Sequence, residues 1–147
     1  MLSLMLGFGI VSRIGSGWLA DRVGGAMTLL LGSTLQAVAL LFYLMADSVV
    51  SLYIVSALFG LFQGGIVPSY AIIVREYFPP REAASRVGLT VSSTVLGMAL
   101  GGWMGGKLFD ITGSYQGAFI NGIGWNVLNA AIAWWLLSRQ MRRTAAA

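Results

Sequence analysis

The sequence predicts an all-α polytopic transmembrane helix bundle. Hydrophobic residues make up 57% of the chain and charged residues 10%, whereas an average soluble domain has roughly a quarter charged residues. The apolar residues also come in runs of about twenty, the length that crosses the hydrocarbon core of a bilayer as a helix. Because lipid offers the backbone no hydrogen-bond partner, each run should be helical.

Polar residues divide the chain into five apolar segments. The first, residues 2–16, is too short at about 15 residues to cross comfortably, and we interpret it as the end of a truncated helix. In the long third segment Pro68 removes a backbone donor and predicts a kink. Four full spans are expected, at residues 26–46, 49–74, 87–109 and 118–137, followed by a basic tail at 138–147.

The distribution of basic residues orients these spans. One side of the predicted bundle holds only Lys107, and the other holds seven arginines. The positive-inside rule therefore places the arginine side and the C-terminus in the cytoplasm, with the chain in the plasma (inner) membrane. Reading the net charge of +4 as a nucleic-acid surface is the weaker interpretation, so no nucleic-acid partner is expected. The seven arginines on the predicted cytoplasmic side are Arg22, Arg75, Arg81, Arg86, Arg139, Arg142 and Arg143.

Several kinds of chemistry are excluded or unsupported by composition. The chain has neither Cys nor His, which excludes disulfides, thiolate metal sites and thiol catalysis. Its five acidic residues stand at span ends and in loops, and it has no phosphate-binding loop or metal-ligand cluster. We therefore expect no enzyme activity, no metal and no cofactor.

The most specific motif follows the first segment and reads Gly17-Trp-Leu-Ala-Asp21-Arg22-Val-Gly24. Small residues let two helix ends approach, Asp21 can meet a neighbouring helix N-terminus, and Arg22 adds charge to the cytoplasmic face. An ordinary tight turn between helices would also fit this pattern. The motif resembles the G-x-L-x-D-R-x-G signature of the major facilitator superfamily, although Gly25 and Ala26 replace its usual two further basic residues.

Three later segments, residues 60–68, 75–82 and 105–115, resemble the same superfamily in the same order, most closely its monocarboxylate transporter-like members. The resemblance implies that the chain is the end of helix eight and helices nine to twelve, a partial C-terminal half of that fold. The missing N-terminal half would then be its partner, beside the lipid bilayer and a small organic anion as substrate.

The resemblance implies a substrate-binding role for Arg13, because the family's carboxylate-binding Arg stands four residues before the first Gly of the motif. A planar guanidinium can hold a carboxylate with two hydrogen bonds. The family's Asp one turn earlier is Gly9 here, so proton coupling through that pair is not supported. The alternative is that Arg13 extends its long side chain to the lipid headgroups.

Three further sets of residues complete the expected sites. Tyr53, Gln63 and Tyr70 recur at helical spacing, which favours either a cavity lining or hydrogen bonds between helices. Gly97, Gly101 and Gly105 form a small-residue surface for helix packing. By the family's pseudo-symmetry, Arg75 would lie near Asp21 and latch a cytoplasmic gate, with Pro68, Gly64 and Gly65 supplying a bend.

The function expected is therefore transport of a small organic solute, with a carboxylate as the leading candidate. The fragment alone should not transport, because its family binds substrate between two halves. The alternative is a small membrane scaffold or regulatory protein whose glycine-rich face packs against other transmembrane helices.

Overall fold

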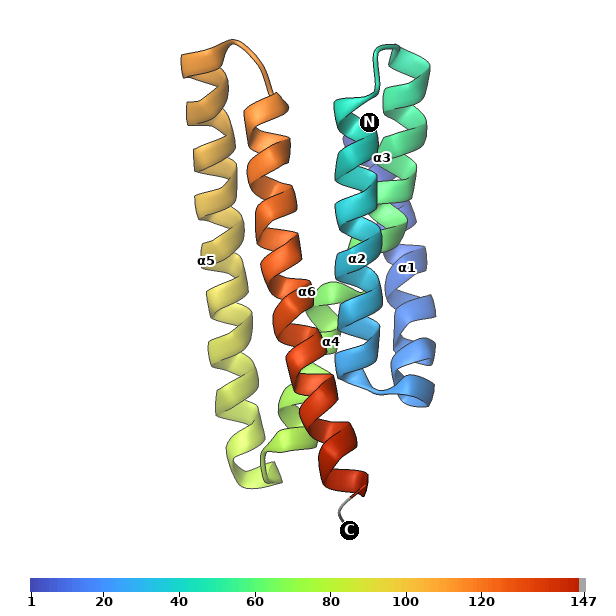
Figure 1. Cartoon of the computed structure of the whole chain (residues 1–147), viewed down its shortest axis with the longest axis vertical. Coiled ribbons are helices and arrows are strands. Elements are labelled where there is room, and N and C mark those ends of the chain that lie inside the picture. Colours follow the sequence, from blue (N-terminus) through green and yellow to red (C-terminus); the bar gives the residue numbers. More distant parts are fainter. Residues whose placement is uncertain (146–147) are drawn as a thin grey trace.

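The computed structural model describes the backbone of residues 1–145 and the side chains of residues 1–142. That part of the chain is an all-α bundle, as predicted, in which α3 and α4 run in one direction as a single interrupted span and the other successive helices alternate in direction (Figure 1). The end of the predicted tail and the Arg143 side chain lie outside the described residues. The helices are α1 (Leu2–Val23), α2 (Gly25–Leu44), α3 (Val49–Gln63), α4 (Ile66–Tyr77), α5 (Pro80–Thr112) and α6 (Gln116–Ala145).

Helix α2 is the centre of the bundle and packs against α1, α3, α4 and α6. Small residues buried along it, including Gly25, Ser33 and Ala39, let neighbouring helices approach closely. The buried apolar cluster consists of Leu29 from α2, Ile66 from α4 and Ala133 from α6.

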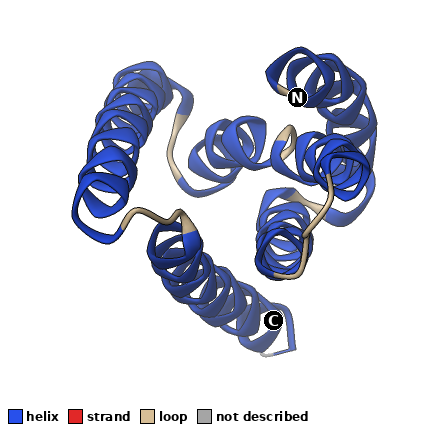
Figure 2. Ribbon diagram, turned by 90° about the horizontal axis from the view of Figure 1, so that it is seen from above, coloured by secondary structure: helices blue, strands red, loops and turns tan. Residues whose placement is uncertain are grey.

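Helix α5 stands at one edge of the bundle, opposite the edge where the N-terminus lies (Figure 2). It packs against α4 and α6, and none of its residues is buried. Its exposed apolar side chains suit contact with lipid or with further helices.

In the described part of the chain, four helical segments are long and apolar enough to cross a membrane: α1, α2, α5 and the combined segment Val49–Tyr77 of α3 and α4. In its described part α6 does not reach the same hydropathy, because it carries Asn121, Asn126 and Asn129. The expected span at 118–137 stays a prediction.

The first helix is longer than the sequence indicated, with 22 residues ending at Val23. The motif therefore occupies its last turns and is not a loop. Asp21 and Arg22 are compatible with a helix, and a basic residue in the last turn favours the helix dipole. Gly24 ends the helix with a φ of 84°, which glycine adopts without steric cost.

The long third segment is interrupted at Gly64 and Gly65, between α3 and α4. The break lies one turn before Pro68. Proline has no N–H to donate to the carbonyl four residues earlier, that of Gly64, and its ring crowds that carbonyl. Pro68 is thus in the first turn of α4, where a missing donor is tolerated.

Candidate functional site

Arg13 and Gln63 lie at the same level near the middle of the bundle, and we call them the mid-bundle site. Ser12 donates a hydrogen bond from its hydroxyl to the carbonyl of Leu61 and lies directly against Gly64. The residues next to these, Arg13 and Gln63, are therefore level with the helix break. The Arg13 side chain is exposed and the Gln63 side chain is half-buried. Neither side chain has a hydrogen-bond or ion-pair partner among the described residues.

Glycines on α3 and at the break allow α1 to lie directly on this segment. A β-carbon on Gly60 would overlap the carbonyl of Met5, and one on Gly64 would lie 2.5 Å from the carbonyl oxygen of Gly9. A β-carbon on Gly65 would lie 2.5 Å from Cβ of Ser16. This contact was not predicted, although the Gly60-x-x-x-Gly64 spacing could have indicated it.

Tyr70 belongs to a partly buried polar network that joins three helices. Its hydroxyl donates to Oδ1 of Asn129 at 3.1 Å, and Nδ2 of Asn129 donates to the Ser33 hydroxyl at 2.7 Å. Ser33 is fully buried. The network ties α4 to α6 and α2 immediately after the break, so the Tyr70 hydroxyl holds helices together in this structure.

The predicted polar stripe does not form one face. Tyr53 is 44% exposed, and Ser56, one turn further on, is buried and accepts a hydrogen bond from Tyr43 of α2 at 2.8 Å. The interruption at Gly64 and Gly65 changes the helical phase between Gln63 and Tyr70. The structure therefore brings neither tyrosine to the mid-bundle site.

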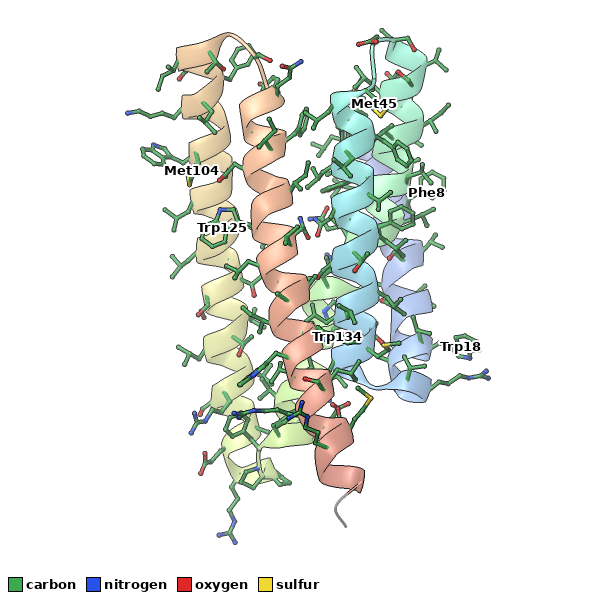
Figure 3. All side chains as sticks on the ribbon, viewed as in Figure 1. Phe8, Trp18, Met45, Met104, Trp125 and Trp134 are labelled. Atoms are coloured by element: carbon green, nitrogen blue, oxygen red, sulfur yellow. The ribbon has the colours of Figure 1, made fainter. Side chains whose placement is uncertain are left out.

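The motif residues in the last turn of α1 differ in their burial within the bundle. Ala20 is buried, whereas Asp21 and Arg22 are exposed. The Arg22 guanidinium lies 3.9 Å from the centre of the Trp18 ring, and Figure 3 shows Trp18 pointing away from the bundle.

Glu76, and not Arg75, makes the contact between the end of α4 and the α1–α2 corner. Oε1 of Glu76 accepts a hydrogen bond from the backbone N–H of Gly25 at 3.0 Å. Asp21 and Arg75 form no ion pair among the described residues. One residue along a helix turns the side chain by about 100°, so Arg75 instead lines a cavity with Phe78 and Pro80.

Replacing Glu76 with alanine should lower stability by about 1 kcal/mol, because a carboxylate at a helix N-terminus is lost. Asp110→Ala is the control, since Asp110 is an exposed carboxylate near the C-terminal end of α5, away from any helix N-terminus. Thermal unfolding in detergent measures both variants. Equal midpoints for the two would contradict the role of Glu76.

Replacing Asn129 with alanine should cost about 0.6 to 1.7 kcal/mol, the range of interhelical hydrogen bonds in membranes. Asn121→Ala is the control, because no hydrogen bond of the Asn121 side chain occurs in the described structure. Denaturant unfolding in mixed micelles gives the comparison. A control as unstable as Asn129→Ala would show that the network adds nothing.

Among the described residues, the glycine stripe of α5 is open at Gly97 and Gly101 and meets α6 at Gly105. A β-carbon on Gly97 or Gly101 would meet nothing within 4 Å, and one on Gly105 would only touch Cβ of Ala118 at 3.8 Å. Helix packing by this stripe stays a prediction.

Comparison with known proteins gives consistent matches. Residues 1–146 match the sequence profile of the Major Facilitator Superfamily. Probable anion transporter 5 of Arabidopsis thaliana is 31% identical over 121 residues, covering 80% of this chain and 28% of that protein. Monocarboxylate transporter 13 of Rattus norvegicus is 30% identical over 113 residues, covering 76% and 26%. The hexuronate transporter of Bacillus subtilis is 32% identical over 129 residues, covering 86% and 30%. The chain thus spans less than a third of the length of each of these relatives.

Proposed function

This chain belongs to the Major Facilitator Superfamily, and from that premise we propose that it is part of a secondary transporter for a small organic anion, most specifically a carboxylate. Its apolar helices and family make it an integral, multi-pass membrane protein. The single observation that carries the proposal is the unpaired guanidinium of Arg13 in the mid-bundle site. The relatives' names, which specify anions, a monocarboxylate or a hexuronate, support the same substrate class.

The position of Arg13 has a physical cost that binding would offset. An arginine within a membrane span is costly unless it faces a partner or a water-filled cavity. A carboxylate supplies that partner, and the planar guanidinium can bind both of its oxygens. Gln63 adds an amide donor at the same level, beside the helix break. Interrupted helices near the bilayer midplane often line transporter sites.

The end of the bundle that carries Arg22, Arg75, Arg81, Arg86 and Arg139, which we call the basic end, faces the cytoplasm in this proposal, and so does the C-terminus. The membrane would be the plasma (inner) membrane. The α1–α2 and α4–α5 corners both lie at the basic end (Figure 1). The Glu76–Gly25 contact joins these corners and would open when the cytoplasmic gate opens.

Transport would also need helices beyond those described. The exposed apolar surface of α5 and its glycine stripe are where we propose that these helices pack, including the N-terminal half of the transporter. The same open stripe favours the second candidate function, a membrane scaffold that binds other helices.

The test is uptake of labelled carboxylates by cells expressing the longest reading frame that contains this chain. We expect accumulation that other carboxylates inhibit and that neutral analogues of equal size leave unchanged. Uptake of neutral or cationic solutes alone would contradict the proposal that the substrate is a carboxylate. An inserted protein that moves no solute would favour the scaffold.

A further inference from the structure

We propose that the basic end of the bundle holds the headgroup of one anionic phospholipid at the corner between α4 and α5. A cavity of about 380 Å³ lies at this corner. Five of its six lining residues are apolar, and the sixth is Arg75. The lining consists of Arg75, Phe78, Pro80, Ala83, Ala84 and Val87.

Arg75 supplies an unsatisfied positive charge to this cavity. No carboxylate lies within ion-pair distance of it in the part of the chain that the structure describes, where Glu82 and Arg86 form the one ion pair at 3.1 Å. A second guanidinium, that of Arg86, lies 4.5 Å from the centre of the Phe78 ring. Phe78 itself lines the cavity. A phosphate would receive the charge-assisted hydrogen bonds that Arg75 lacks.

The position of the cavity indicates a lipid. The corner joins two candidate membrane spans, Val49–Tyr77 and Pro80–Thr112, so it lies where helices leave the hydrocarbon core. Anionic headgroups occupy that level and attract basic residues. The apolar wall along the first turns of α5 suits the glycerol and upper acyl chain of a phospholipid, which a free phosphate does not have.

A second cavity at the basic end makes a useful contrast. It is lined by Glu76, Tyr77, Trp135, Leu136, Arg139 and Gln140. Here a carboxylate lines the same cavity as the arginine and would repel an anionic headgroup. The charges therefore favour the α4–α5 corner for the lipid.

Native mass spectrometry of the detergent-purified protein, expressed from the longest reading frame, tests the proposal by titration with phosphatidylglycerol or phosphatidylcholine. Arg75→Gln should weaken phosphatidylglycerol binding by more than tenfold and leave phosphatidylcholine unchanged. Arg22→Gln is the control, because it removes the same charge from the same end on α1, at the opposite edge (Figure 1). One surface charge accounts for about fivefold. Equal weakening by both substitutions would mean diffuse attraction and overturn the site.

A second pair of variants changes the size of a side chain without changing the charge of the protein. Ala84→Trp should fill the cavity and remove phosphatidylglycerol binding, whereas Ala131→Trp, at an exposed position on α6, should leave it intact. Size-exclusion chromatography verifies that both are folded. Unchanged binding in Ala84→Trp would overturn the proposal. Glycerol 1-phosphate that competes as well as the lipid would also overturn it, by reducing the site to one for free phosphate. None of these readouts depends on transport.

Discussion

Replacing Arg13 with lysine should reduce carboxylate uptake by roughly 10- to 100-fold. Lysine keeps the positive charge but lacks the planar fork that binds two carboxylate oxygens. Hydrogen bonds to charged groups contribute about 1.5 to 3 kcal/mol, and each 1.4 kcal/mol corresponds to a tenfold change. Because the Arg13 side chain has no hydrogen-bond or ion-pair partner among the described residues, the substitution should leave folding largely unchanged.

The measurement is initial-rate uptake of labelled carboxylates at matched surface expression. Arg142→Lys is the control, because Arg142 lies near the end of α6, is exposed and takes no part in the mid-bundle site. If Arg13→Lys transports at the rate of the parent protein, Arg13 does not bind the substrate. That result would support the alternative in which the Arg13 side chain reaches the lipid headgroups. Equal loss in both variants would indicate a general effect of arginine replacement.

Replacing Gly64 with alanine should destabilise the protein by about 1 to 3 kcal/mol, the usual cost of overpacking a close contact. The added methyl group would lie 2.5 Å from the carbonyl oxygen of Gly9 and 2.6 Å from Cβ of Ser12. The first neighbour is backbone and cannot rotate away, so α1 has to move off α3. That movement would also displace Arg13 relative to Gln63.

Gly101→Ala is the matched control, because it introduces the same methyl group into a helix at a position with open space. It should be neutral or stabilising by up to about 1 kcal/mol, since alanine favours the helix. Thermal unfolding of the two variants of the 147-residue chain, purified without the further helices proposed to pack on α5, provides the comparison. A Gly101 variant as unstable as the Gly64 variant would show that an unseen helix covers α5. A stable Gly64 variant would contradict the α1–α3 contact.

The sequence predicted the class of fold and the family because both depend on signals spread over many residues. Apolar runs, the arginine distribution and the segments from Gly17 to Gly24 and 60 to 68 all pointed to the same helical bundle. Helix ends were less well predicted. Asp21 and Arg22 look like a loop by polarity, but they continue α1 until Gly24 adopts its positive φ.

The candidate site was only partly predictable. Arg13 and Gln63 were proposed from the sequence, and the structure places them at one level. The Tyr70–Asn129–Ser33 network could not be anticipated, because its members are 59 and 96 residues apart along the chain. No local pattern reports which of many buried polar side chains will meet.

By itself, the sequence determined that this protein is a helical membrane bundle with one strongly basic end, since composition and the length of the apolar runs settle solvent and secondary structure. The resemblance of its motifs, from Gly17 to Gly24 above all, indicated the major facilitator family. Only the tertiary structure decided which side chains meet: Glu76 in place of Arg75 at the α1–α2 corner, Gly60 and Gly64 against α1, and Tyr70 against Asn129. The physical reason is geometric. A step of one residue turns a helical side chain by about 100°, and a two-glycine break shifts the phase of everything beyond it, so contacts between helices depend on small rotations that no local pattern records.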